Sequence, residues 1–391
     1  MSMIIDGLGT ATPAHGISQS SAAEIAQTLC CDNAKQARLL SALYQRSGVR
    51  YRHSVALESS EPRFDSSASQ NGDFGGGELR VPAATEHATT TQPVRQTFFA
   101  PASSPEDCGP TTAQRMELYE RHAGRLGAES VLQALDRSSF NAGEINHLIT
   151  ISCTGFYAPG LDVSIIKRCG LDPSVGRTHI GFMGCHGALN GLRVAESLAA
   201  SNPQLRVLMC AVELCTLHQQ YGWHPERVVS NALFADGAAA LVASASPSSS
   251  RGPTVIATGS TILPDSEDLM RWRIGDHGFE MTLSPRVPTM IERTLEPWLR
   301  DWLGKHQLTI GDIRGWAIHP GGPKILQACG DALQFRRGEL SVSQSILADY
   351  GNMSSPTVLF ILQRLLQEPE SMPCVMLGFG PGLSIEAALI G

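Results

Sequence analysis

Short, uninterrupted apolar runs recur along most of this 391-residue chain, and segments suited to helices lie between some of them. Such runs are typical of strands that are buried on both faces of a sheet. We expect strands at 148–153, 206–213, 238–245, 254–260, 314–318, 374–377 and 385–390, and helices at 111–135, 188–200 and 356–366. This order predicts an α/β fold with a mostly parallel sheet flanked by helices.

Two similar turns indicate that the same unit occurs twice. GFMGC at 181–185 leads into the helix at 188–200, and YGNMS at 350–354 leads into the helix at 356–366. In the second turn, Ser355 and Pro356 are typical of a helix cap followed by proline in the first turn. We therefore predict a duplicated α/β unit.

The composition excludes several classes of protein. Hydrophobic residues make up 42% and charged residues 17%, a balance that disordered chains do not reach. The 30 Lys and Arg against 37 Asp and Glu give a formal charge of −7, and no basic run is present, so we expect no nucleic-acid partner. No apolar run approaches the roughly 18 residues that span a bilayer. Residues 1–13 lack the basic start of a signal peptide, so we expect a cytoplasmic protein with no membrane partner.

The ten cysteines are spread over a long chain without an export signal, which predicts reduced thiols. No pair has the two-residue spacing typical of a zinc site, so we expect no metal. Most should be small buried apolar side chains, and a reactive one must be identified by its surroundings.

Residues 54–109 differ from the rest of the chain. Of these 56 positions, 23 are Ser, Thr, Pro or Gly and only 9 are large apolar residues. Such a stretch buries too little to offset the entropy of ordering it. We expect a mobile surface insertion or lid, anchored at one end by Phe98 and Phe99.

Cys185 stands out among the thiols because it follows Gly184 at the junction of a strand and an amphipathic helix. The sulfur should lie near the positive end of the helix dipole, a setting that lowers a thiol pKa and favours the thiolate. An arbitrary cysteine is more often a buried, unreactive side chain than a nucleophile. The position of Cys185, taken alone, favours neither of these two alternatives over the other.

A nucleophilic cysteine needs a base. His319 ends a predicted strand and precedes the rigid PGGP turn at 320–323, so it should lie at the carboxyl edge of the sheet, where ligand sites form. Asn352 matches Cys185 in the second turn, but local sequence favours a left-handed turn residue after Gly351. The order Cys, His, Asn also occurs in papain-like proteases, whose local signature around the cysteine is absent.

Several ordered motifs resemble type III polyketide synthases, the chalcone synthase-like branch of the thiolase superfamily. They are Gly184-Cys185, WAIHPGGP at 316–323, DYGNMSS at 349–355 and GFGPG at 378–382, supported by CTGFYAPG at 153–160 and ALFADGAA at 232–239. The resemblance covers the chain from about residue 1 to its end, the 54–109 stretch excepted. The segment Glu213-Leu214-Cys215 further resembles bacterial members of the alkylpyrone and alkylresorcinol branch, which accept long acyl chains.

The resemblance implies a thiolase-like, duplicated αβαβα five-layer fold in a homodimer. It implies an N-terminal half at 1–245 that carries the nucleophile and a C-terminal half at 246–391 that carries the other two catalytic residues. The family's triad corresponds to Cys185, His319 and Asn352. Cys185 would accept an acyl starter from acyl-CoA, and His319 and Asn352 would stabilise the enolate formed when malonyl-CoA loses carbon dioxide. Iteration and ring closure would give a pyrone or resorcinol, with no cofactor beyond the CoA substrates.

The resemblance also assigns binding residues. Phe234 matches the aromatic residue between the CoA tunnel and the cavity. Other positions that correspond to the cavity are Thr154, Ala158, Cys215, His218, Met281, Gly380 and Pro381. Arg46, Gly321, Gly322 and Lys324 are candidates for binding CoA, the two charged ones as partners of its phosphates.

Two alternatives remain open. One is a ketoacyl synthase of the same fold that depends on acyl carrier protein, although HPGG at 319–322 replaces the HQAN loop of those enzymes. The other is a non-catalytic acyl-CoA-binding homologue, which would have no need of a reactive thiol.

Overall fold

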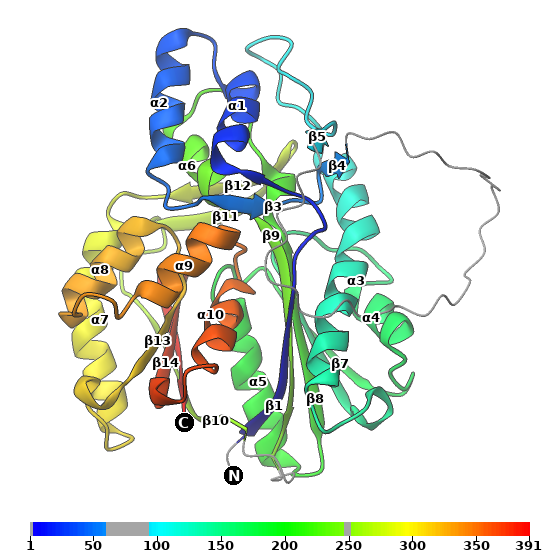
Figure 1. Ribbon diagram of the computed structural model, residues 1–391, viewed down its shortest axis with the longest axis vertical. Helices are drawn as coiled ribbons and strands as arrows, with labels where there is room; N and C mark the ends of the chain where they lie inside the picture. The colour runs from blue at the N-terminus through cyan, green and yellow to red at the C-terminus, as the bar shows by residue number, and fades with distance from the viewer. Residues whose placement is uncertain (1–2, 60–93, 246–251) are drawn as a thin grey trace.

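The computed structural model describes residues 3–59, 94–245 and 252–391 (Figure 1). In these ranges the largest sheet has nine strands in the order β13-β14-β15-β10-β1-β9-β8-β6-β7. Their bounds are β1 (Met3–Ala11), β6 (His147–Ser152), β7 (Gly176–Gly181), β8 (Arg206–Leu214), β9 (Asp236–Ser244), β10 (Thr254–Ile262), β13 (Gly315–Ile318), β14 (Cys374–Gly380) and β15 (Ser384–Ile390).

The pairing in this sheet is mixed. β13 with β14, β6 with β7 and β6 with β8 are parallel. The other five pairings are antiparallel and include the short contact between β1 and β10 that joins the two halves. Parallel pairing is thus confined to the outer strands of each half, which corrects the expectation of a mostly parallel sheet.

Helices lie in three layers around the two halves of the sheet (Figure 1). The first outer layer holds α3 (Thr112–Asp136) and α4 (Leu161–Cys169), and the opposite outer layer holds α7 (Val287–Gly304) and α8 (Pro323–Leu333). The middle layer holds α5 (Gly187–Ser201) and α10 (Thr357–Leu365), whose side chains share one core with strands of both halves. The thiolase-like five-layer α/β fold and its duplication are therefore confirmed.

A smaller group of elements covers the upper end of these layers in Figure 1. It contains α1 (Gln19–Cys30), α2 (Ala34–Gln45), α6 (Pro225–Leu233) and the hairpin of β11 (Met270–Gly275) and β12 (Gly278–Leu283). α9 (Ser341–Tyr350) lies beside α10, and short strands pair as β2 (Gly16–Ser18) with β3 (Tyr51–His53). Single turns of 3-10 helix occur at Ala142–Glu144, Cys215–His218, Ile310–Asp312 and Pro369–Ser371.

The predicted strands and helices are confirmed to within three residues at each end. One local detail is wrong: Ser355 does not cap α10, whose N-cap is Pro356 without a side-chain hydrogen bond. The Ser355 hydroxyl instead donates to Glu213. The Ser355 hydroxyl therefore binds a buried carboxylate and does not cap the helix.

The described ends of the 54–109 insertion are fixed to the body. β4 (Leu57–Ser59) pairs with β5 (Val94–Gln96) in an antiparallel sheet. Phe99 is buried in a core with residues of α1, α2 and α6, and the Phe98 ring packs against it edge to face. The predicted anchor is confirmed, while the expectation of a mobile lid falls on residues 60–93, outside the described part of the chain.

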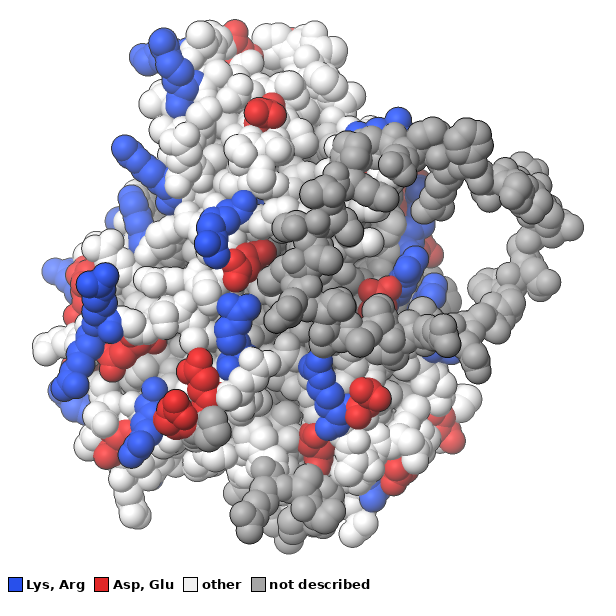
Figure 2. All heavy atoms as spheres, viewed as in Figure 1, with Lys and Arg blue, Asp and Glu red and all other residues white. Residues whose placement is uncertain are grey.

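On the face shown in Figure 2, basic and acidic side chains are interspersed. Within the described ranges, no helix combines the length and the apolar character needed to cross a membrane.

Candidate active site

Cys185 lies between the end of β7 and the start of α5, as the sequence predicts. Gly184 adopts φ +82°, a conformation that L side chains rarely adopt. A Cβ on Gly184 would also lie 2.8 Å from Cδ of Pro381, so the turn packs directly against the segment after β14. The thiol is buried, with 6% of the residue exposed.

The pKa of Cys185 is shifted in the direction opposite to the one expected from the sequence. Burial raises the pKa of this thiol to about 11, and the charge of Glu213 contributes in the same direction. Hydrogen bonds from Ser354 and Asn352 lower the pKa, but by less than burial raises it. The resting group is therefore a thiol at neutral pH, not the thiolate that its place near a helix start predicts.

His319 follows β13 and is held by its backbone, since its N–H donates to Leu377 O at 2.8 Å. The side chain is buried, and neither ring nitrogen has a hydrogen-bond partner among the described residues. Burial, and secondarily the neighbouring His186, lower the pKa of His319 to about 3. A neutral imidazole with both nitrogens unused is poised to accept a proton or to donate to a ligand.

Asn352 precedes α10 in a segment with the left-handed residues Gly351 and Ser354, while Asn352 itself is not left-handed. The local explanation of Asn352 as the left-handed turn residue is therefore wrong. Its Oδ1 accepts from the backbone N–H of Ser354 at 2.8 Å, which fixes the amide. The side chain is buried and hydrogen-bonds toward Cys185, so its NH2 group faces the thiol.

Cys185, His319 and Asn352 line one hollow of about 440 Å³. Its remaining wall is mostly apolar: Leu233, Phe234, Met270, Met281, Leu283, Ile325 and Phe379. The structure therefore brings together three residues that lie up to 167 positions apart in the sequence, from Cys185 to Asn352.

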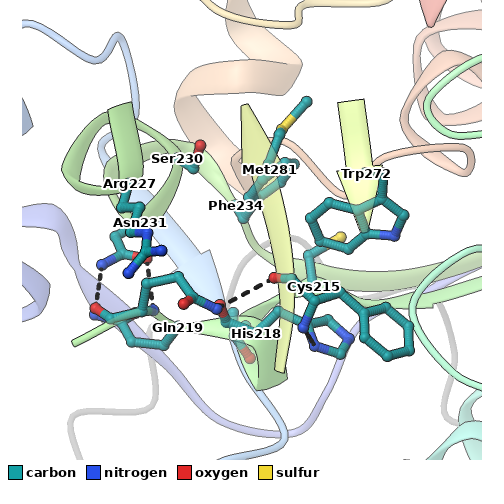
Figure 3. A pocket seen from close by; sticks show the side chains of 12 residues that line it. Cys215, His218, Gln219, Arg227, Ser230, Asn231, Phe234, Trp272 and Met281 are labelled. Carbon is teal, nitrogen blue, oxygen red and sulfur yellow. Dashed lines mark hydrogen bonds between the residues drawn. The ribbon is translucent and has the colours of Figure 1, made fainter. Parts of the chain in front are cut away.

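A second hollow of about 350 Å³ shares Ser230, Phe234 and Met281 with the first. Figure 3 shows its lining, which includes the predicted cavity residues Cys215 and His218. Phe234 also forms an isolated parallel bridge with Asn352, so the ring that separates the hollows is tied to the site by its backbone.

His218 is locked in one neutral tautomer. Its Nε2–H donates to Thr154 O at 2.7 Å, and its Nδ1 accepts from Phe279 N–H at 2.9 Å. The imidazole stacks on Phe279 with ring centroids 4.1 Å apart and meets Trp272 edge to face at 5.5 Å. Burial lowers the pKa of His218 to about 3, so this residue is an uncharged wall and not an acid or base.

Four predicted cavity residues, Thr154, Ala158, Gly380 and Pro381, line neither hollow. Thr154 is buried, and its hydroxyl donates to Glu213 at 2.7 Å and accepts from the backbone N–H of Leu214 at 2.9 Å. Ala158 is exposed in the loop between β6 and α4. Gly380 and Pro381 lie behind the nucleophile: a Cβ on Gly380 would meet the His186 ring at 2.2 Å.

The candidate CoA residues gather around the first hollow. Gly321 lines it, and Gly322 is buried with φ 151° at the start of α8. Arg46 ends α2 and is exposed, as is Lys324 in the first turn of α8. These two segments touch, because a Cβ on Gly48 would lie 3.1 Å from Cγ of Pro323.

The sequence analysis missed Glu213 as a site residue. Its fully buried carboxylate accepts from Cys153 N–H at 2.9 Å and from the hydroxyls of Thr154 and Ser355 at 2.7 and 2.6 Å. It thereby joins the end of β6 to the segment that carries Asn352. The signal in the sequence is one acidic residue directly after the apolar run at 207–212 and before Leu214.

Ser354 was also missed. Its hydroxyl lies 3.6 Å from Sγ of Cys185 and 3.4 Å from Sγ of Cys153. A thiol, an imidazole and an amide on one apolar hollow can support nucleophilic attack followed by stabilisation of an oxyanion or enolate.

Two family models together match most of the chain. Residues 102–247 match the model "Chalcone and stilbene synthases, N-terminal domain" and residues 254–391 match "Chalcone and stilbene synthases, C-terminal domain".

Individual relatives extend over nearly the whole chain. "Alpha-pyrone synthesis polyketide synthase-like Pks18" of Mycobacterium tuberculosis is 31% identical, over 99% of this chain and 90% of that protein. "1,3,6,8-tetrahydroxynaphthalene synthase" of Streptomyces peucetius subsp. caesius is 32% identical, over 97% of this chain and 91% of that protein. The crystal structure of PKS-I from the brown alga Ectocarpus siliculosus superposes with a TM-score of 0.82 at 27% identity, covering 100% of this chain and 98% of that one.

Proposed function

This chain belongs to the chalcone and stilbene synthase family of type III polyketide synthases, and we propose that Cys185, His319 and Asn352 perform its chemistry. Members of the family are acyltransferases that extend an acyl starter by decarboxylative condensation with malonyl-CoA and then cyclise the product. One observation carries the residue assignment: a buried thiol, an unpartnered imidazole and a fixed amide line the same hollow.

Loading begins when His319 takes the proton of Cys185. The two groups are neutral at rest, and the opposite charges formed by proton transfer stabilise each other inside the apolar hollow. The Cys185 sulfur attacks the starter thioester, the bond from the acyl carbon to the CoA sulfur breaks, and the CoA thiolate takes the proton from His319. The acyl group is then held on Cys185.

Extension uses the same side chains in a second role. His319 and Asn352 donate to the thioester carbonyl of malonyl-CoA, so the electron pair left by carbon dioxide is held as an enolate. Its carbon attacks the acyl group on Cys185 and releases the Cys185 sulfur. The wall of Leu233, Phe234 and Phe379 excludes water that would protonate the enolate.

The growing chain passes Phe234 and Met281 into the second hollow. Its lining combines the aromatic rings of Trp272 and Phe279 with the polar side chains of Gln219, Gln220 and Asn231. This composition suits a short polyketone that is apolar along its faces and carries carbonyl groups, and its cyclised pyrone or resorcinol.

Arg46 and Lys324 are proposed to bind the CoA phosphates, because both are exposed on touching segments beside the hollow that holds Cys185. We also propose a homodimer and a cytoplasmic location. The exposed apolar side chains of Phe156, Phe182 and Met183 support the first, and the ten free cysteines support the second. Sedimentation equilibrium tests the homodimer.

Peptide mapping of the trapped acyl-enzyme tests the nucleophile. The protein is incubated with hexanoyl-CoA alone, quenched in acid, digested and analysed by mass spectrometry. We expect the hexanoyl mass on the peptide with Cys185 in the parent and in Cys215→Ala, and its loss in Cys185→Ala. Acylation of Cys153 or Cys215 in place of Cys185 would refute the assignment. Acylation by a hexanoyl carrier protein but not by hexanoyl-CoA would favour a ketoacyl synthase.

A further inference from the structure

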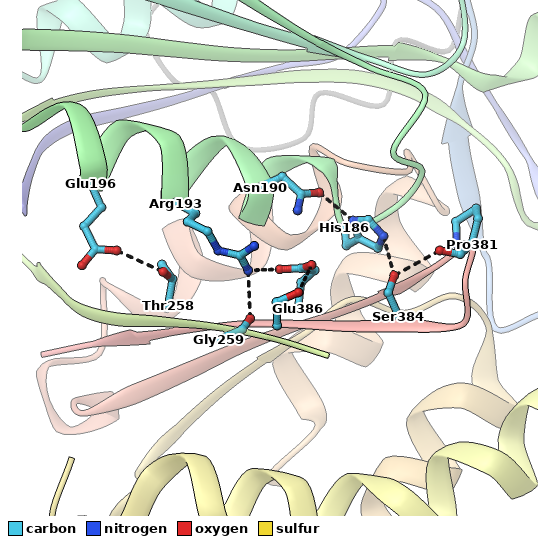
Figure 4. Close-up of polar contacts among 10 residues, drawn as sticks. His186, Asn190, Arg193, Glu196, Thr258, Gly259, Pro381, Ser384 and Glu386 are labelled. Carbon is cyan, nitrogen blue, oxygen red and sulfur yellow. Dashed lines mark hydrogen bonds and ion pairs between the residues drawn. The ribbon is translucent and has the colours of Figure 1, made fainter. Parts of the chain in front are cut away.

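We propose that His186, the residue after the nucleophile, is a positioning residue that holds the Cys185 turn in its reactive place by linking it to residues 378–384. The inference rests on the proposed role of Cys185. His186 caps the start of α5, yet its side chain makes no capping bond to that helix. It points across to the C-terminal half instead (Figure 4).

The His186 ring fills a space that two glycines leave open. A Cβ on Gly380 would lie 2.2 Å from Cδ2 of His186 and a Cβ on Gly378 would lie 3.1 Å from its Cβ, so a side chain at Gly380 would displace the ring. His186 is 2% exposed. The imidazole is thus enclosed between α5 and the end of β14.

Both ring nitrogens are hydrogen-bonded, one to each side of this interface. Nδ1 lies 2.7 Å from Oδ1 of Asn190 on α5, and Nε2 lies 2.7 Å from the Ser384 hydroxyl at the start of β15 (Figure 4). An amide oxygen only accepts, so Nδ1 carries the proton. Burial lowers the pKa of His186, so the ring is neutral at pH 7 and Nε2 accepts from Ser384. The Ser384 hydroxyl has one proton, and its contact with Nε2 at 2.7 Å is shorter than its contact with Pro381 O at 3.2 Å.

These contacts restrain Cys185 through the residues before and after it in the chain. On one side Gly184 packs against Pro381, and on the other His186 binds Ser384. Both neighbours of Cys185 in the chain thus contact residues 381–384. Its hydrogen bonds with Ser354 and Asn352, which lower the pKa of the thiol, depend on that placement.

Further along α5 the structure provides a matched control. Thr258 donates to Glu196 at 3.0 Å and so joins α5 to β10, away from the nucleophile (Figure 4). Thr258→Ala removes one bond between α5 and the strands, as Ser384→Ala does, without touching the Cys185 turn.

The test compares Ser384→Ala, His186→Asn, His186→Gln and Thr258→Ala with the parent. Asn at 186 is too short to reach Ser384, while the amide oxygen of Gln reaches the position of Nε2. We expect hexanoyl loading of Cys185 from saturating hexanoyl-CoA to slow by about tenfold in Ser384→Ala and His186→Asn. We expect loading within about threefold of the parent in His186→Gln and Thr258→Ala, and malonyl-CoA decarboxylation within about threefold in all four.

The pH profile of Cys185 alkylation by iodoacetamide adds a measurement that needs no acyl transfer. We expect its midpoint to rise in Ser384→Ala and His186→Asn only, because a displaced thiol loses its hydrogen bonds. Equal slowing in Thr258→Ala, or lower melting temperatures with unchanged loading and alkylation, would overturn the positioning role. If the parent is never acylated while the alkylation pattern holds, the proposed function fails and the positioning role is supported.

Discussion

At the scale of single residues, Glu213 shows how one buried carboxylate organises the site. It accepts hydrogen bonds from Cys153, Thr154 and Ser355. Its charge also raises the pKa of Cys185. Glu213 therefore stabilises the structure around the nucleophile while it opposes formation of the thiolate.

Replacing Glu213 with Gln separates these effects. The variant keeps the shape but places an NH2 group against donors, so the free energy of unfolding should fall by about 1–3 kcal/mol. Loss of the charge should lower the pKa of Cys185, so alkylation by iodoacetamide at pH 8 should become faster. Urea denaturation and alkylation kinetics measure the two quantities. Slower alkylation in a folded Glu213→Gln variant would contradict the electrostatic role.

The lowered pKa of His218 predicts that the protein loses stability in acid. Its pKa is lowered from 6.5 to about 3, so as the pH falls below 6.5 the unfolded chain binds a proton that the folded chain does not. At about 1.4 kcal/mol per pH unit, this residue alone should cost about 3 kcal/mol of stability between pH 6.5 and pH 4. His218→Gln should lose less stability over that range in urea denaturation. Equal losses in both proteins would exclude His218 as the source.

The sequence predicts which residues form the site better than it predicts their electrostatics. Cys185, His319 and Asn352 lie in short ordered motifs, so resemblance identifies them. Their pKa values depend on burial by residues such as Phe379 and Leu233, which are distant in the sequence. The position of Cys185 beside a helix start was predicted correctly, while the direction of its pKa shift was not.

At the scale of elements, β11 limits the second hollow through Trp272. Its Nε1–H donates to Cys153 O at 2.7 Å, which fixes the ring across the space behind Phe234. Trp272→Ala should therefore enlarge the hollow and shift the products by at least one malonyl extension. Mass spectrometry of the products measures the shift, with Trp298→Ala on α7 as the control. Unchanged product lengths in Trp272→Ala would show that another wall limits the chain.

Elements with continuous apolar sequence were predictable, and interrupted ones were not. β8 and β15 are buried along almost their whole length, and their sequences show it. β1 lies in the centre of the sheet, but Asp6, Gly7 and Gly9 interrupt its apolar pattern. Gly9 is required there because a Cβ would lie 2.3 Å from Ser130 O of α3. The close packing of α3 on β1 thus requires a glycine that interrupts the apolar pattern by which a strand is predicted.

At the scale of the whole molecule, we expect residues 60–93 of the insertion to be dispensable for the fold that carries the site. Its described ends pair as β4 and β5, with Ser59 opposite Val94, so a two-residue Asn-Gly turn between them should close the hairpin. We expect replacement of residues 60–93 by this turn to leave the melting temperature and the KM for acyl-CoA unchanged. A tenfold change in KM, from steady-state kinetics, would instead support a lid over the CoA site.

In the proposed reaction, Cys185 carries the chain while His319 and Asn352 generate the enolate. The most direct measurement is mass spectrometry of products and carbon dioxide release from malonyl-CoA, with acyl-CoA starters from acetyl to palmitoyl. We predict starter-dependent pyrones or resorcinols in the parent, and no extended product but continued carbon dioxide release in Cys185→Ala. His319→Ala should lose both activities. Extended products from Cys185→Ala would contradict the account.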